Sequence, residues 1–377
     1  MIVFNRPTSA PGALQKLESA MASGKLSGDG PSTQKASEML SELHDGAKVL
    51  LTTSCTHALE MSALLLDLSP GDEVIVPSFT FVSTANAFVQ AGATPVFVDI
   101  RSDTLNIDEA QVAAAVTERT RAIVPVHYAG VGCEMESLGA TAQRHGLTVI
   151  EDNAHGLFAR RNGRPLGTFG AMSTLSFHET KNISTGEGGA LVINDEAFVE
   201  RAEIIREKGT NRSRFFRGQV DKYTWVDIGS SYLPSELVAA MLVAQLEQAA
   251  LTQQRRSALW WRYQQTLGDW AQEQRVVLPL QGAPEDGAYH MFQILLPNLA
   301  ARTAFISHLR EREVMSVFHY VPLHSSPMGA KVGRAPFGCP ITDDISDRLA
   351  RLPLFTDMTE TEQQQVIDAI ASFRVHG

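Results

Sequence analysis

The residues with the clearest capacity for chemistry lie at 176–189, which read Ser-Phe-His-Glu-Thr-Lys-Asn-Ile-Ser-Thr-Gly-Glu-Gly-Gly. Lys181 stands here between an apolar segment, 173–177, and a glycine-rich turn that leads into a second one, 189–193. Most lysines on turns are solvated charges. A lysine that two buried strands hold in a cleft loses its proton more easily, and the neutral amine forms Schiff bases with carbonyl compounds. Lys181 is therefore our candidate catalytic residue.

Two further groups stand where strands are expected to end. Asp152 follows the apolar run 147–151, which would bury it at the sheet edge that faces the cleft. Residues 53–57, Thr-Ser-Cys-Thr-His, join the first strand to a helix, and a helix N-terminus attracts anions through its free N–H groups and its dipole. From the residues alone, Ser54 or Thr56 could equally be an ordinary N-cap.

Short apolar runs alternate with helical segments from residue 48 to residue 195. The runs are 49–53, 73–77, 95–100, 122–127, 147–151, 173–177 and 190–193, and the helices between them include 56–68, 83–90, 108–115 and 135–145. This alternation predicts an α/β domain with a mainly parallel sheet and helices on both faces, whose ligands bind at the carboxyl ends of the strands. No Gly-x-Gly-x-x-Gly follows the first strand, so a nicotinamide-binding domain has little support.

The segment 206–225 interrupts the alternation and mixes cations with aromatic rings. Its members are Arg206, Lys208, Arg212, Arg214, Phe215, Phe216, Arg217, Lys222, Tyr223 and Trp225. A solvated face needs no aromatic rings, whereas a pocket for a phosphorylated, ring-bearing ligand uses both. We expect a ligand or subunit contact here.

The ends of the chain complete the predicted domain organisation. We expect a helix at 13–22, a glycine-rich loop at 24–30, a long helix at 235–266, strands at 290–296 and 314–319, a helix at 300–313 and a last helix opened by the capping box 359–362. The chain is thus interpreted as a large domain, 1–250, and a smaller α+β C-terminal domain, 251–377.

Composition excludes several classes of function. The formal net charge is −10, and no lysine- or arginine-rich block offsets it, which argues against binding nucleic acid by phosphate neutralisation. No basic leader segment and no apolar run long enough to cross a bilayer is present, so we expect a cytoplasmic protein without a membrane partner. Cys55, Cys133 and Cys339 are scattered, which fits a reducing compartment and gives no metal site.

Ser-Phe-His-x-x-Lys followed by Gly-Glu-Gly-Gly resembles the sugar aminotransferases of the DegT/DnrJ/StrS family, which have the type I aminotransferase fold and use pyridoxal 5'-phosphate. The resemblance covers essentially the whole chain, from about residue 4 to about residue 373. It is strongest to the transaminases that make dTDP-4-amino-4,6-dideoxygalactose, through 24–26, 77–88, 206–225 and 319–324.

The resemblance implies roles for individual residues. Lys181 would hold the cofactor and move the proton, while Asp152 would pair with the pyridine nitrogen. His155 would contact the phenolic oxygen and Phe81 would stack on the ring. The remaining cofactor contacts would come from Thr56, the backbone of His57, Ser176 and Ser231, which stands where relatives often carry an asparagine from the neighbouring subunit. Substrate would be bound by Lys25, Arg212, His319 and Tyr320.

The resemblance also implies a reaction: a two-stage amino transfer from glutamate to C-4 of dTDP-4-keto-6-deoxyglucose, by a homodimer with active sites at its interface. Relatives that act as sugar dehydratases carry histidine in place of Lys181. Two alternatives stay open, an aminotransferase acting at C-3 of a nucleotide-linked 3-keto sugar and a non-catalytic sensor or scaffold with the same fold.

Overall fold

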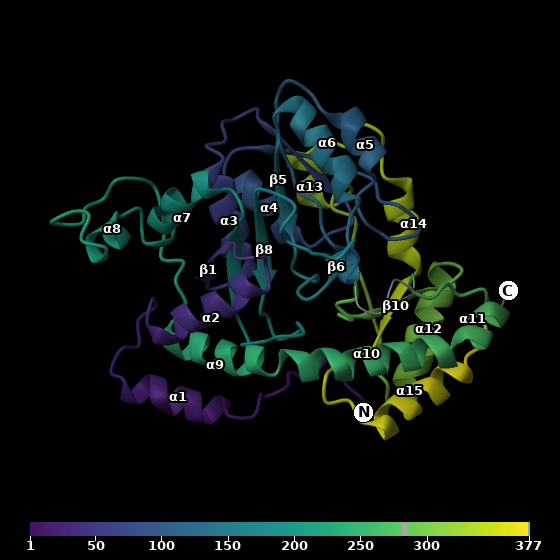
Figure 1. Cartoon of the computed structure of the whole chain (residues 1–377). Helices are drawn as coiled ribbons and strands as arrows, with labels where there is room; N and C mark the ends of the chain where they lie inside the picture. Colours follow the sequence, from purple (N-terminus) through teal and green to yellow (C-terminus); the bar gives the residue numbers. More distant parts are fainter. Residues whose placement is uncertain (281–285, 376–377) are drawn as a thin grey trace.

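A seven-stranded sheet forms the centre of the larger part of the molecule (Figure 1). The computed structural model describes residues 1–280 and 286–375. The strands are β1 (Lys48–Thr52), β2 (Glu73–Pro77), β3 (Thr94–Val98), β4 (Thr120–Ile123), β5 (Thr148–Asp152), β8 (Met172–Ser176) and β9 (Gly189–Ile193). They lie in the order β1-β9-β8-β5-β4-β2-β3, and β9 runs antiparallel to both of its neighbours. The predicted mainly parallel sheet is confirmed.

The apolar strands bury side chains on both faces of this sheet. On β2, Val74 and Val76 pack into the cluster that includes α3 (Cys55–Leu65) and α4 (Val82–Gln90). Ile75 between them packs into the cluster of α5 (Glu109–Ala115) and α6 (Met135–His145), because successive side chains of a strand point to opposite faces. Helices on both faces are what the apolar runs predicted.

Two helices cover the β1–β9 end of the sheet. They are α2 (Pro31–Glu42), which the sequence did not reveal, and α9 (Glu236–Glu247), and α1 (Ala13–Ala22) packs outside α9. The predicted long helix 235–266 is wrong in one respect: its backbone breaks at Gln248, and α10 (Ala249–Thr266) continues from there. Figure 1 shows α9 and α10 running almost end to end from the large sheet to the C-terminal part.

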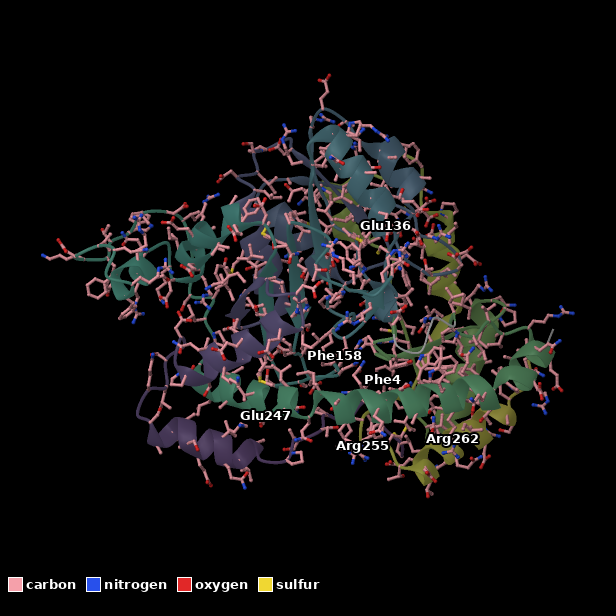
Figure 2. All side chains as sticks on the ribbon, viewed as in Figure 1. Phe4, Glu136, Phe158, Glu247, Arg255 and Arg262 are labelled. Atoms are coloured by element: carbon pink, nitrogen blue, oxygen red, sulfur yellow. The ribbon has the colours of Figure 1, made fainter. Side chains whose placement is uncertain are left out.

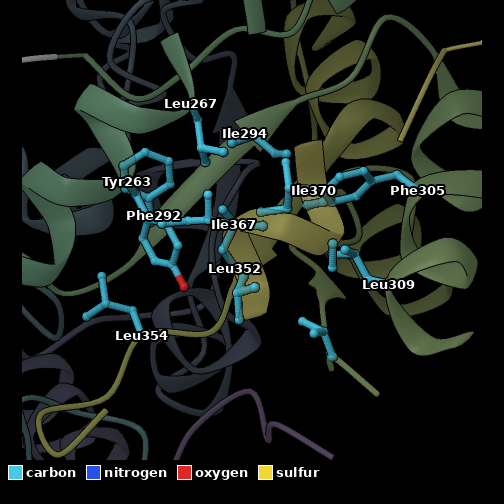
Figure 3. Close-up of a cluster of buried hydrophobic side chains, with 14 of the residues drawn as sticks. Tyr263, Leu267, Phe292, Ile294, Phe305, Leu309, Leu352, Leu354, Ile367 and Ile370 are labelled. Carbon is cyan, nitrogen blue, oxygen red and sulfur yellow. The ribbon is translucent and has the colours of Figure 1, made fainter. Parts of the chain in front are cut away.

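The C-terminal part is a small antiparallel sheet covered by helices. Its strands are β10 (Phe292–Leu295), β12 (Leu349–Leu352) and β11 (Val317–Phe318), in that order. Of the helices in this region, α14 (Pro340–Arg348) packs against α12 (Leu299–Glu311), whereas α13 (Pro327–Val332) packs against β3 of the large sheet. The small sheet shares its core with α10, α11 (Gly268–Gln274), α12 and α15 (Glu360–Ala371). Figure 3 shows the core that they enclose, in which Phe292 and Leu352 of the strands meet Phe305 and Ile370 of the helices.

One strand of the C-terminal part is shorter than the sequence predicted. The strand expected at 314–319 pairs with β12 only over Val317 and Phe318, because Val314 bridges instead to Ile2 of the N-terminal segment. The expected capping box at Thr359 is confirmed, since its hydroxyl accepts from the Glu362 N–H and the Glu362 carboxylate from the Thr359 N–H. The division at residue 250 stays an interpretation.

The segment 206–225 extends away from the body of the molecule (Figure 1). It follows α7 (Val199–Arg206) and contains the short helix α8 (Arg212–Phe216). A two-stranded hairpin, β6 (Arg160–Arg161) and β7 (Arg164–Pro165), completes the described strands. No helix within residues 1–280 and 286–375 is long and apolar enough to cross a membrane.

Glu236 at the start of α9 fixes α2 beside it. Its buried carboxylate accepts hydrogen bonds from the N–H groups of Gly30, Ser32 and Thr33 at 3.0, 2.8 and 2.9 Å. These are N-terminal N–H groups of α2, which have no acceptor within the helix.

Replacing Glu236 by alanine leaves these donors without their acceptor. We expect Glu236→Ala to lower the free energy of unfolding by about 3 kcal/mol, measured by urea titration followed by circular dichroism. Glu38→Ala, which removes an exposed carboxylate of α2, is the control and should shift the midpoint little. Equal midpoints for the two variants would contradict this account.

Candidate active site

One edge of the large sheet gathers the candidate residues. Thr52 at the end of β1 and Ser176 at the end of β8 both pair with Gly189, the first residue of β9. Asp152, at the end of β5, pairs with Thr174 of β8. The carboxyl ends of three strands and the turn before β9 therefore meet at one edge, where open α/β sheets bind their ligands.

The start of α3 lies directly against Gly189. A Cβ atom at Gly189 would come within 2.3 Å of the Ser54 carbonyl carbon, so only glycine permits this approach. Ser54 caps the helix, because its hydroxyl accepts from the His57 N–H at 3.1 Å. Thr56 adds a hydroxyl 2.8 Å from that of Ser83. The N–H groups of this first turn and the helix dipole can hold a phosphate here.

Asp152 is a buried carboxylate with two donors. The Thr84 hydroxyl donates to its Oδ2 at 2.7 Å, and the Ala154 N–H donates to its Oδ1 at 3.2 Å. Burial raises the pKa of Asp152, and the hydrogen bond from Thr84 acts in the opposite direction. A carboxylate in such a place pairs strongly with a cationic ring nitrogen, because few waters screen the two charges.

Glu151, the residue before Asp152, fixes the end of β5. The buried Glu151 carboxylate accepts from the N–H groups of Gly167, Phe169 and Gly170 at 2.7–2.8 Å. It also lies 2.8 Å from His127 Nε2. This set of hydrogen bonds holds the strand end that carries Asp152.

Lys181 lies in the short connection between β8 and β9. The Phe177 N–H donates to the Gly188 carbonyl at 2.8 Å, and the Thr185 N–H donates to the Phe177 carbonyl at 2.9 Å, which closes the connection at its base. Burial lowers the pKa of Lys181 to about 8, with Asp152 acting against this shift and Arg351 adding to it. Lys181 is therefore available as a neutral amine near neutral pH.

Buried rings form the other side of the site. The His155 and His290 rings stack at 4.5 Å, and the Tyr128 hydroxyl lies 2.9 Å from His319 Nδ1. Burial lowers the pKa of His155, His290 and His319 well below the usual histidine value, so the three imidazoles are neutral. His155 Nδ1 is buried and has no hydrogen-bond partner in the described parts of the chain, which leaves a polar atom for a ligand oxygen.

Two aromatic side chains lie near this group. Phe81 is the N-cap of α4 and is 56% exposed, so its ring is free to cover a planar ligand. The Tyr320 ring lies 6.4 Å from that of Phe81 and 5.6 Å from that of Phe79. Burial raises the pKa of Tyr320 far above its ordinary value, so its hydroxyl stays protonated.

The expected substrate residues fall into two groups. His319 and Tyr320 lie with His155 and Tyr128 at the site. Lys25 and Arg212 do not: the exposed Lys25 ammonium donates to the Asp29 carbonyl, and Arg212 is on α8. Their roles stay predictions, as do those of the other site residues.

Ser231 lies beside the phosphate turn of its own chain. It is exposed, and the carbonyl of the next residue, Tyr232, accepts from the Thr53 N–H at 3.0 Å. The Tyr232 ring also meets the His57 ring edge-on at 5.2 Å. The predicted contact between Ser231 and the cofactor phosphate of the neighbouring subunit stays a prediction.

Sequence reasoning missed four residues of this site: Thr84, Tyr128, His290 and Arg351. Only Thr84 carried a signal, since it lies in the quoted stretch 77–88 and follows Thr80 by one helical turn. The other three come from loops or strands whose pairing partners the apolar pattern does not specify.

A large groove lies elsewhere on the molecule. It measures about 1060 Å³ and is lined by Lys48 and Val49 at the start of β1 and by Ile193 and Asn194 at the end of β9. These are the strand ends opposite to Lys181. No group of histidine, cysteine and carboxylate side chains within the described residues could hold a metal ion.

Known proteins are similar to this chain in sequence and in fold. Residues 8–371 match the DegT/DnrJ/EryC1/StrS aminotransferase family. The spore coat polysaccharide biosynthesis protein SpsC of Bacillus subtilis is 32% identical over 97% of this chain and 95% of its own. A pleiotropic regulatory protein of Geobacillus stearothermophilus is 36% identical over 85% and 83% of the two chains. The PLP-form structure of the putative sugar aminotransferase Spr1654 of Streptococcus pneumoniae superposes with a TM-score of 0.90, at 25% identity, over 98% of both chains.

The lowered pKa of Lys181 predicts how the chain reacts with an aldehyde. Only the neutral amine attacks, so the rate at which cofactor-free protein captures pyridoxal 5'-phosphate should rise about tenfold per pH unit and level off above about pH 8. The visible absorbance of the captured cofactor gives this rate. Lys181→Ala should lack the reaction, and a rate that still rises beyond about pH 10, as for an ordinary lysine, would refute the shift.

Proposed function

Because the chain belongs to the DegT/DnrJ/EryC1/StrS aminotransferase family, we propose that it transfers the amino group of glutamate to C-4 of dTDP-4-keto-6-deoxyglucose, giving a dTDP-4-amino-4,6-dideoxyhexose. Family membership confirms the expected type I aminotransferase fold and pyridoxal 5'-phosphate as the cofactor. The acceptor rests on the likeness of residues 79–88 and 319–324 to the dTDP-4-amino-4,6-dideoxygalactose transaminases.

The observation that carries the reaction is the placement of Lys181 and Asp152 at one sheet edge beside the first turn of α3. These three features suit the aldehyde, the ring nitrogen and the phosphate of the cofactor, and the free Nδ1 of His155 suits its phenolic oxygen. When bound, pyridoxal 5'-phosphate supplies an electron sink for the negative charge that develops on the donor's α-carbon.

The chain's own residues then have defined tasks. The Asp152 carboxylate keeps a proton on the ring nitrogen, and Thr84 holds that carboxylate in place. The Lys181 amine, once released from the aldehyde, takes the proton from the donor's α-carbon at its Nζ and later returns a proton to the sugar carbon. A base with a pKa of about 8 suits both steps, because its two protonation states are of similar energy near neutral pH.

Two alternatives keep a place beside this proposal. An aminotransferase acting at C-3 would use the same machinery, and only the orientation of the sugar distinguishes it. A regulatory role is suggested by the name of one relative, the pleiotropic regulatory protein. Lys181 with a lowered pKa beside a buried Asp152 is of no use to a sensor or scaffold, so we favour catalysis. We also propose a cytoplasmic location, because the scattered cysteines fit a reducing compartment.

The acceptor is tested by comparing kcat/KM for the 4-keto and 3-keto isomers of the dTDP-linked sugar, with glutamate as donor. A site that orients a sugar by hydrogen bonds leaves its polar groups unpaired when the carbonyl is misplaced. We therefore expect the 4-keto sugar to be preferred at least ~100-fold. Lys181→Ala is the inactive control, and equal or better turnover of the 3-keto sugar would move the assignment to C-3.

We further propose a homodimer with active sites at the interface. The projecting segment 206–225 and the residues just after it expose large apolar side chains: Phe216 is 69%, Trp225 77% and Ile228 58% exposed. Exposed apolar groups of this size usually mark an interaction surface. A second copy of the chain would cover them and would let Arg212 reach a nucleotide bound beside the other subunit's Lys181.

Mixing two inactive variants tests both parts of this proposal. If Arg212 serves the partner's site, a dimer of one Lys181→Ala and one Arg212→Ala chain has one intact site. Random exchange of subunits should then restore about a quarter of wild-type activity, although each variant alone is nearly inactive. The interface should bury more than ~2,000 Å², and light scattering should give a dimer. A fully active monomer, or no recovery on mixing, would contradict the composite site.

A further inference from the structure

Arg351 is a half-buried cation at the site, with a buried Nε, to which no role has been assigned. It lies on β12, the middle strand of the small sheet, opposite Gln293 of β10 and Val317 of β11. Its charge contributes to lowering the pKa values of Lys181, His155 and His319, after the larger effect of burial. The guanidinium of the C-terminal part therefore acts on the amine of the large domain.

The Arg351 guanidinium has no counterion in the parts of the chain that the structure describes. None of their ion pairs involves it, and its Nε is buried without a hydrogen-bond partner. One Nη2 donor reaches the Phe318 carbonyl at 3.3 Å. The group also stacks 4.7 Å from the centre of the ring of Phe4, which Figure 2 labels close to α10. Stacking holds the cation and leaves most of its five N–H donors free.

Two other arginines with low exposure have protein partners for their charge or their donors, the buried Arg256 and the half-buried Arg334. Arg256 donates to the carbonyls of Tyr289, His290 and Leu354, and Arg334 makes a two-point ion pair with Glu73. Withdrawing part of a charge from water without a counterion is costly, whereas a ligand anion that pairs with it recovers that cost on binding. Burial lowers the pKa of Arg351.

Four anionic groups belong to the proposed reaction, on which this step rests. The cofactor phosphate suits the first turn of α3, beside Thr56. The nucleotide diphosphate is separated from the reacting carbon by the sugar ring. The γ-carboxylate of glutamate is separated from the reacting carbon by two methylene groups. The donor's α-carboxylate is bonded directly to the carbon whose proton Lys181 removes, so it must lie next to Lys181.

We propose that Arg351 binds the α-carboxylate of the amino donor and thereby makes the site select an α-amino acid. The unsatisfied Nε and the free Nη donors supply the hydrogen bonds, and the Phe4 ring and the Phe318 carbonyl orient them. The C-terminal part thus contributes donor specificity, while the large domain contributes the proton-transfer groups.

Glutamate and 4-aminobutyrate differ only by the α-carboxylate, so together they isolate this contact. The conversion of the bound cofactor to its aminated form, followed by absorbance without keto sugar, gives an apparent dissociation constant for each donor. We expect Arg351→Gln to weaken glutamate about 100-fold and to leave the already weak 4-aminobutyrate unchanged. Arg351→Lys, which keeps the charge, should recover part of the loss. Arg255→Gln, which removes an exposed arginine, should behave as wild type.

A second readout separates this role from a merely structural one. Removing the Arg351 charge should raise the pKa of Lys181, so the pH profile of cofactor capture should shift upward in Arg351→Gln and not in Arg351→Lys. Equal weakening of glutamate and 4-aminobutyrate would place the γ-carboxylate at Arg351 and overturn the proposal. So would an unchanged preference for glutamate in Arg351→Gln.

The same measurements distinguish a failure of the proposed function from a failure of the Arg351 contact. If the wild type prefers glutamate through Arg351 but does not aminate the keto sugar, the Arg351 contact is supported and the proposed acceptor is wrong. A wild type that reacts with 4-aminobutyrate as well as with glutamate, or with no α-amino acid, would overturn the donor assignment and the Arg351 contact together.

Discussion

The desolvation of one amine is the constraint on which the rest of the structure depends. Lys181 is useful only while it loses its proton easily, and burial achieves this at the cost of stability. The neighbouring charges work against each other: Asp152 favours the protonated amine and Arg351 disfavours it. Glu151, Thr84 and the close approach at Gly189 then hold the groups around the amine in fixed positions.

The site joins the two parts of the molecule, and two stacked histidines lie at that junction. On the C-terminal side, Arg256 of α10 donates to the carbonyls of Tyr289 and His290 before β10 and of Leu354 after β12. His290 stacks on His155, which stands just beyond the strand end that carries Asp152. The relative position of the Asp152 carboxylate and the C-terminal part is thus fixed by contacts between buried groups, and these do not require a ligand.

Much of this arrangement could be predicted from the sequence because its signals are local. The apolar runs that end at Asp152 and Ser176 show the strands, and the glycines after Lys181 show the turn, so these residues could be placed at one edge. The break between α9 and α10 could not be foreseen, since Gln248 is neither glycine nor proline and the amphipathic pattern continues through it. Thr84 and Arg351 escaped notice because their partners, Asp152 and Phe4, are distant in sequence and only the packed fold brings them together.

The reversal of β9 has a consequence for motion during turnover. In a wholly parallel sheet, the residues after β8 would begin a long crossover, and the reactive lysine would lie on a connection free to adopt many conformations. Here the connection returns at once, and Ser176 and Gly189 hold its two ends at the same level of adjacent strands. The backbone of Lys181 is therefore a fixed pivot. In the proposed reaction, the amine travels between donor and acceptor by rotation of the side chain alone, and such rotations are far faster than the rearrangement of a loop.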